Sequence, residues 1–145
     1  MNTVYEIVTI KQVVKESDFE IDKIRSPKDA AEAIIKQIGD EDRENFLVLC
    51  LNTKNDVVAI HKASIGSLNA AIIHPREVFK AAILNNAASI IVSHNHPSYD
   101  PTPSREDIEV TKRLMEAGTI LGIEVLDHLV IGGTSYISLK EKGYM

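Results

Sequence analysis

The sequence predicts an α/β domain in which a mixed β-sheet is flanked by helices. Short apolar runs rich in β-branched residues alternate with segments of helical periodicity, and turn-forming residues separate them. The chain has 145 residues, of which 44% are hydrophobic, and this is enough for one compact core. We therefore expect a single globular domain over residues 27–145, preceded by an N-terminal strand extension over residues 1–26.

The first elements can be assigned from alternation and capping residues. Between Thr3 and Val14, β-branched and charged residues mix as in a long, partly exposed strand, which would pair either at a sheet edge or with a second copy. A helix should follow, with Ser26 as its N-cap and Pro27 in its first turn, and should end at Gly39.

The rest of the chain predicts a hairpin and then alternating strands and helices. Turn formers at 52–56 separate two apolar runs, 46–51 and 57–63. The later elements are a strand near 69–73, a helix over 75–86, a strand over 88–93, a helix from Ser104 to Gly118, a strand over 124–131 and a hairpin strand around Tyr136. The order β-α-β-β-β-α-β-α-β-β is that of a mixed sheet with helices packed on it.

Charge and cysteine content exclude several classes of protein. The net charge of −5 and the pI near 5.5 argue against strong nucleic-acid binding, which usually requires a clustered basic face. The single cysteine, Cys50, lies in an apolar run and is expected to be a small buried core residue. With no signal peptide and no apolar stretch of membrane length, we expect a cytoplasmic protein with no membrane contact.

The strand over 88–93 leads directly into a motif that predicts a metal site. Side chains at positions i and i+2 of a strand share a face, so His94 and His96 point the same way and Asn95 points away. Ser104 and Asp107 then have the spacing of a helix N-cap and its N3 residue, after a proline-rich loop that could fold back over the strand end. Two imidazoles and a carboxylate would leave the fourth position of a tetrahedral zinc ion open to water.

Each part of this motif also has a simpler interpretation. A lone His-x-His is more often unliganded, and Ser104 with Asp107 is compatible with a capping pair only. The combination of strand, histidines, stiffened loop and helix start favours one catalytic Zn²⁺ per chain.

The pattern His-x-His-Pro, six residues, Ser-x-x-Asp resembles the JAMM motif of the JAB1/MPN metalloenzymes. Four further segments resemble the RadC branch of that family: Ile65–Leu68, His74–Phe79, His94–Ser98 and Leu126–Gly132. The resemblance runs from about Pro27 to the C-terminus and implies the three-layer, cytidine-deaminase-like sandwich. It departs at Tyr99, where RadC-like chains usually carry Gly, and this length leaves no room for the N-terminal helix-hairpin-helix region of longer RadC proteins.

The resemblance also implies catalytic residues. JAMM enzymes use an upstream glutamate as the base, at the start of the strand after the first helix, and Glu44 occupies that place. Glu41 and Glu77 are competing carboxylates, and the acidic run could equally consist of solvated loop charges. Ser104 would donate a hydrogen bond to the oxyanion of the reaction while it caps its helix as an acceptor.

Three other polar residues near the motif are candidates for supporting roles. His128 could orient a zinc ligand by a hydrogen bond without binding the metal itself, although a satisfied core histidine fits equally well. Ser93 and Asn95 could hold the motif loop, and Asn95 could also contact substrate. His61 and His74 are expected to be surface and turn residues, away from the metal.

Three classes of function follow from these observations. The leading one is a zinc metallopeptidase or isopeptidase-like hydrolase that acts on a peptide or protein substrate. The alternatives are a catalytically silent MPN-type interaction domain and a DNA-repair-associated accessory protein. Retention of every metal ligand favours the first class over the second, and the acidic pI opposes the third. A homodimer through the N-terminal strand is a further expectation.

Overall fold

The computed structural model describes residues 2–65 and 73–145 and contains the expected mixed sheet with helices. In chain order the elements are α1 (Pro27–Ile38), β1 (Asn45–Leu51), β2 (Val57–Ile65), α2 (Pro75–Leu84), β3 (Ser89–Asn95), α3 (Arg105–Leu121), β4 (Glu124–Gly132) and β5 (Ser135–Ser138). Of the strand expected near 69–73, residues 69–72 lie outside the described residues. The predicted α/β fold class is confirmed.

The five strands of the described sheet lie in the order β2-β1-β3-β4-β5. Strands β3 and β4 run parallel, whereas the other neighbours in this sheet are antiparallel. Parallel neighbours need a crossover connection, and α3 supplies it between β3 and β4. The carboxyl end of β3 and the amino end of α3 therefore come together at one edge of the molecule.

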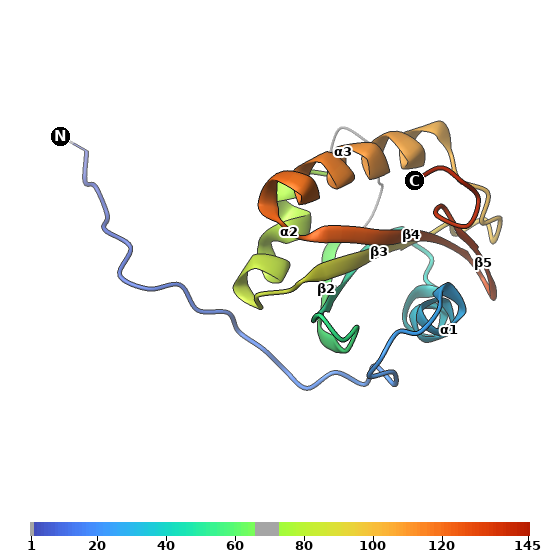
Figure 1. The fold of residues 1–145 in the computed structure, drawn as a ribbon, viewed down its shortest axis with the longest axis horizontal. Helices are drawn as coiled ribbons and strands as arrows, with labels where there is room; N and C mark the ends of the chain where they lie inside the picture. The colour runs from blue at the N-terminus through green and yellow to red at the C-terminus, as the bar shows by residue number, and fades with distance from the viewer. Residues whose placement is uncertain (1, 66–72) are drawn as a thin grey trace.

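Helices cover both faces of the sheet, with α2 and α3 on one face and α1 on the other (Figure 1). Strand β1 is buried on both faces, and its side chains alternate between the two cores. Phe46, Val48 and Cys50 pack on the α2 and α3 side, whereas Leu47, Leu49 and Leu51 pack on the α1 side. The side chains of β3 alternate in the same way, so neighbouring residues of the metal motif face different layers.

The strand expected between Thr3 and Val14 is absent, and this prediction is wrong for the isolated chain. The segment is exposed and has no secondary structure, and it extends away from the body beyond a side-chain contact between Gln12 and Asn85 at the end of α2 (Figure 1). A strand needs a neighbour for its backbone N–H and C=O groups, and pairing near the sheet starts only with a bridge between Lys23 and Asp56. None of the helices, over the described part of the chain, has the length and apolar content needed to span a bilayer.

The end of α3 also differs from expectation. The helix continues past Gly118 to Leu121, and Gly122 is the residue that ends it with a left-handed φ of 74°. Gly118 is needed for close packing instead, because a Cβ at this position would lie 2.4 Å from the carbonyl oxygen of Ile123. The glycine lets the helix approach the start of β4 closely.

Candidate metal centre

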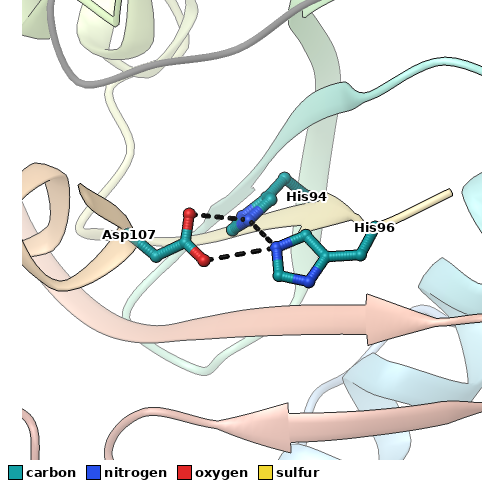
Figure 2. A group of neighbouring side chains, drawn as sticks. All are labelled: His94, His96 and Asp107. Carbon is teal, nitrogen blue, oxygen red and sulfur yellow. Dashed lines mark hydrogen bonds and ion pairs between the residues drawn. The ribbon is translucent and has the colours of Figure 1, made fainter. Parts of the chain in front are cut away.

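Three side chains of the predicted motif meet where β3 ends and α3 begins. His94 is the second-last residue of β3, and His96 directly follows the strand. Asp107 is in the first turn of α3. Figure 2 shows their side chains converging on one point. His94 is almost fully buried, and the side chains of His96 and Asp107 are each 16% exposed. The site is therefore open to solvent on one side.

The distances between the three side chains suit a tetrahedral metal ion. The Nε2 atom of His94 lies 3.1 Å from Nε2 of His96 and 3.0 Å from Oδ1 of Asp107, and Nε2 of His96 lies 3.2 Å from Oδ2 of Asp107. Ligands placed about 2.05 Å from a tetrahedral Zn²⁺ are separated from one another by about 3.3 Å. The donor atoms of this His-His-Asp set could therefore hold a metal ion with little rearrangement.

The hydrogen bond on the far side of His96 prepares its Nε2 atom for a metal. Its Nδ1 lies 2.8 Å from the carbonyl oxygen of Asp100, which can only accept, so Nδ1 must carry a proton and donate it. In neutral His96 the lone pair then belongs to Nε2 and faces the other two side chains. Near its carboxylate partner Asp107, the pKa of His96 is raised, although burial opposes this.

Asp107 remains an anion in this environment. Burial alone would raise its pKa, but the adjacent side chains of His94 and His96 outweigh this effect and hold the pKa well below its usual range. Its backbone N–H donates to Ser104 Oγ at 3.1 Å, and its Oδ2 accepts the Ser104 backbone N–H at 2.8 Å. The capping pair expected from the sequence is thus a full capping box, and the same carboxylate faces the histidines.

A second line of contacts leads from His94 into the core. Nδ1 of His94 lies 2.8 Å from Nε2 of His128, and Nδ1 of His128 lies 2.6 Å from the hydroxyl of Thr111. The Thr111 hydroxyl donates to the carbonyl oxygen of Asp107 at 2.8 Å. His128 is fully buried, and burial lowers its pKa well below the ordinary value. Phe46 packs against both histidine rings.

The three side chains of the His-His-Asp set line a cleft of about 480 Å³. Its polar lining residues are Glu44, His94, His96, Ser98, Ser104, Glu106, Asp107 and His128. Of the three glutamates considered as the base, Glu44 is half-buried in this cleft and contributes to raising the pKa of His96, so its carboxylate lies within electrostatic range of the site. Glu77 pairs with Lys80 on α2 at 3.0 Å, and Glu41 is exposed in the turn before β1.

Asn95, on the other face of β3, fixes the loop that carries Glu44. Its Oδ1 accepts the backbone N–H of Asn45 at 2.7 Å, and its Nδ2 donates to the carbonyl oxygens of Arg43 at 2.9 Å and Glu41 at 3.4 Å. Asn95 is 1% exposed, so its amide serves the loop rather than the cleft surface. The bonds to Arg43 and Asn45 hold the backbone on both sides of Glu44.

The remaining candidates lie farther from the chemistry. Ser93 is fully buried, and its hydroxyl has no hydrogen-bond partner within residues 2–65 and 73–145. His61 is on β2, where it pairs with Val48, and His74 is the N-cap residue of α2. Tyr99 adopts a left-handed φ of 67°, and its ring lies against Gly133.

Thr111 is the site residue that sequence reasoning missed. It lies on the buried face of α3 beside Val110 and Leu114 and is itself fully buried. The available signal was a hydroxyl within an apolar stripe, four residues after Asp107 and therefore on the same helix face. Its partner His128 lies on another element, so the pair becomes visible only in the fold.

Comparison with known proteins places this fold and site in a family. The RadC-like JAB domain matches residues 24–144. UPF0758 proteins of Caldanaerobacter subterraneus subsp. tengcongensis and Geobacillus sp. strain WCH70 are each 60% identical to the chain, over 121 and 122 residues. UPF0758 protein YsxA of Bacillus subtilis is 58% identical over 122 residues.

These matches cover 83%, 84% and 84% of the chain but only 52%, 54% and 53% of the respective relatives. The chain thus spans about half the length of the curated relatives it matches. The matched region contains every element from α1 to β5 and every residue of the His-His-Asp cluster. The chain belongs to the RadC-like JAB domain family.

Proposed function

We propose that this protein is a zinc-dependent hydrolase that cleaves an amide bond of a peptide or protein, as a peptidase or an isopeptidase. The observation that carries the proposal is the convergence of His94, His96 and Asp107 at tetrahedral spacing beside an open cleft. A structural zinc usually has four protein ligands, whereas three protein ligands and solvent access are typical of a catalytic zinc.

The residues around the cleft can support each part of such a reaction. A bound Zn²⁺ would polarise the scissile carbonyl and lower the pKa of a water molecule to about 7. Glu44 would accept a proton from the attacking water and then donate it to the leaving amine as the C–N bond breaks. The same proton therefore moves from water to product, and Glu44 returns to its carboxylate form.

Ser104 is suited to stabilising the developing oxyanion. In the capping box its oxygen accepts a hydrogen bond, so the cap does not consume the hydroxyl proton. Ser104 lines the cleft, and its hydroxyl can donate a hydrogen bond to a substrate oxygen bound there. Removal of one such donor typically costs about 3 kcal/mol of transition-state stabilisation.

A catalytically silent interaction domain is the alternative from a different class. The retained ligand set and the anionic Asp107 favour the hydrolase, because a carboxylate beside two imidazoles is a donor set that suits a divalent cation. Strong binding to nucleic acid is not part of the proposal, since the chain carries a net charge of −5.

Metal content of the purified protein tests the proposal. Elemental analysis should find about one zinc per wild-type chain. His96→Ala and Asp107→Asn should each lose it. Asparagine keeps an oxygen that can accept the Ser104 backbone N–H, so the helix cap survives while the charge is lost.

His74→Ala is a matched control, because His74 caps α2 without a side-chain hydrogen bond and should leave the zinc in place. Glu44→Gln should retain zinc but lose cleavage of peptide and isopeptide substrates. Wild-type protein that stays metal-free after incubation with zinc would refute the proposal.

A further inference from the structure

We propose that Thr111 and His128 form a hydrogen-bond relay that fixes the tautomer of His94, so that its Nε2 atom is the one available to a metal ion. The two residues touch neither substrate nor metal and act through His94, as positioning residues. This inference rests on the proposed zinc site for its purpose, whereas the direction of the relay follows from the bond that Thr111 donates to the Asp107 carbonyl oxygen.

The relay has a fixed starting point at the Asp107 carbonyl oxygen. That oxygen can only accept, so the Thr111 hydroxyl, 2.8 Å away, must use its single proton for this bond. If the proton pointed to His128 instead, two lone pairs would face each other across 2.8 Å in the core. Thr111 therefore acts toward His128 as an acceptor.

The same reasoning sets the two histidines in turn. Since Thr111 accepts at 2.6 Å, Nδ1 of His128 must carry the proton. A neutral imidazole has one N–H, so Nε2 of His128 is an acceptor. It lies 2.8 Å from Nδ1 of His94, which must then carry the proton of that ring. Nε2 of neutral His94 is left with a lone pair directed at His96 and Asp107.

Burial makes this arrangement difficult to replace. Thr111 and His128 are both 0% exposed, and the ring of Phe46 packs edge-on against His128. Bulk water therefore does not offer alternative partners, and reversing both tautomers would require the Thr111 hydroxyl to turn its proton from the Asp107 carbonyl oxygen to His128. The relay also joins α3, β4 and β3, because its residues come from these elements in that order.

The relay matters for zinc because the metal requires an unprotonated nitrogen. Partners on the far nitrogen of a ligating histidine fix its tautomer, and loss of such a partner typically weakens metal affinity about 10–100-fold. Asp107 is both a candidate ligand through its carboxylate and the end of the relay through its carbonyl. The relay therefore connects the backbone of one candidate ligand, Asp107, to the imidazole of another, His94.

The tautomers can be measured without a metal. Long-range ¹H–¹⁵N NMR spectra of the full chain, labelled in its five histidines and kept in a chelator, distinguish protonated from unprotonated ring nitrogens. The spectra should be recorded about 1.5 pH units above the ordinary histidine pKa of about 6.5. His94 and His128 should each show a protonated Nδ1 and an unprotonated Nε2. A protonated Nε2 with unprotonated Nδ1 on either ring in the wild type would overturn the relay.

A pair of variants tests the role of the hydroxyl. Thr111→Val keeps the shape but removes the acceptor, so His128 should shift toward the Nε2–H tautomer and His94 should follow, and the zinc Kd, measured by chelator competition, should rise about 10–100-fold. Thr111→Ser keeps the hydroxyl and should retain the wild-type tautomers and zinc Kd. Unchanged tautomers in a folded Thr111→Val protein would refute the relay. Correct tautomers in a wild type that binds no zinc would instead support the relay and refute the proposed function.

Discussion

Asn95 offers the sharpest test of how the fold positions the proposed base, because its side chain is the clamp on the loop that carries Glu44. In Asn95→Ala the backbone N–H of Asn45 loses its acceptor at 2.7 Å, and the carbonyl of Arg43 loses one of its two donors, at 2.9 Å. We expect a large loss of stability together with a loosened loop before β1.

The magnitude follows from the burial of the two abandoned groups. Asn45 is 2% exposed, so its N–H cannot turn to water, and a buried unsatisfied donor costs about 1–3 kcal/mol. Arg43 is an exposed residue whose carbonyl oxygen also accepts a hydrogen bond from Asn45 Nδ2 at 3.0 Å, so losing the Asn95 amide there should cost about 1 kcal/mol or less. The free energy of unfolding should fall by about 3 kcal/mol in total, which is a large part of the roughly 5–15 kcal/mol typical of a domain.

Equilibrium unfolding in urea, with a chelator present so that metal binding does not contribute, measures this loss. With an m-value of about 2 kcal/mol/M, the midpoint should fall by about 1.5 M. Asn95→Asp should lose at least as much, because its carboxylate would face the Arg43 carbonyl with an acceptor. Asn2→Ala is the matched control at an exposed position and should stay within about 0.5 kcal/mol of wild type. An Asn95→Ala protein equally close to wild type would refute the clamp.

Three further predictions concern other parts of the chain. Gly132→Ala places a Cβ 2.6 Å from the backbone nitrogen of Pro101, so it should cost about 1–3 kcal/mol and lower the Tm measured by circular dichroism by at least about 2 °C, and an unchanged Tm would contradict the close contact. Burial raises the pKa of Cys50 to about 11, so at pH about 8 its thiol should react with a disulfide reagent only after unfolding, and rapid reaction of the folded protein would contradict this. If residues 3–14 pair with a second copy, light scattering should give twice 16.0 kDa for the full chain and the mass of one shortened chain after deletion of residues 2–14, whereas a monomeric full chain would contradict the pairing.

The His-His-Asp cluster could be predicted from the sequence because short-range rules determine it. Strand periodicity places His94 and His96 on one face, and capping chemistry places Asp107 in the first turn of a helix. Both rules operate over a few residues. The parallel pairing of β3 with β4 then brings the strand end and the helix start together, as crossover connections generally do.

Features that depend on distant partners could not be predicted in the same way. The hydrogen bonds of Asn95 join residues 50 and 52 positions apart, and those of His128 join residues 17 and 34 positions apart. No local pattern encodes these pairings. For the N-terminal segment the local pattern predicted too much. Residues 3–14 have the composition of a strand, but no neighbouring strand pairs with them.

His94, Asn95 and His96, at and just after the end of β3, make contacts on opposite sides of the sheet. His94 and His96 lie on the α2 and α3 side of the sheet, where the relay from Thr111 and the carboxylate of Asp107 reach them. Asn95 lies on the other side and reaches only the loop before β1. Because the two sets of hydrogen bonds share no atom, Asn95→Ala should lower stability while leaving the tautomers of His94 and His128 as in the wild type. A change in either tautomer would show that the candidate base and the candidate ligands are held by one coupled network.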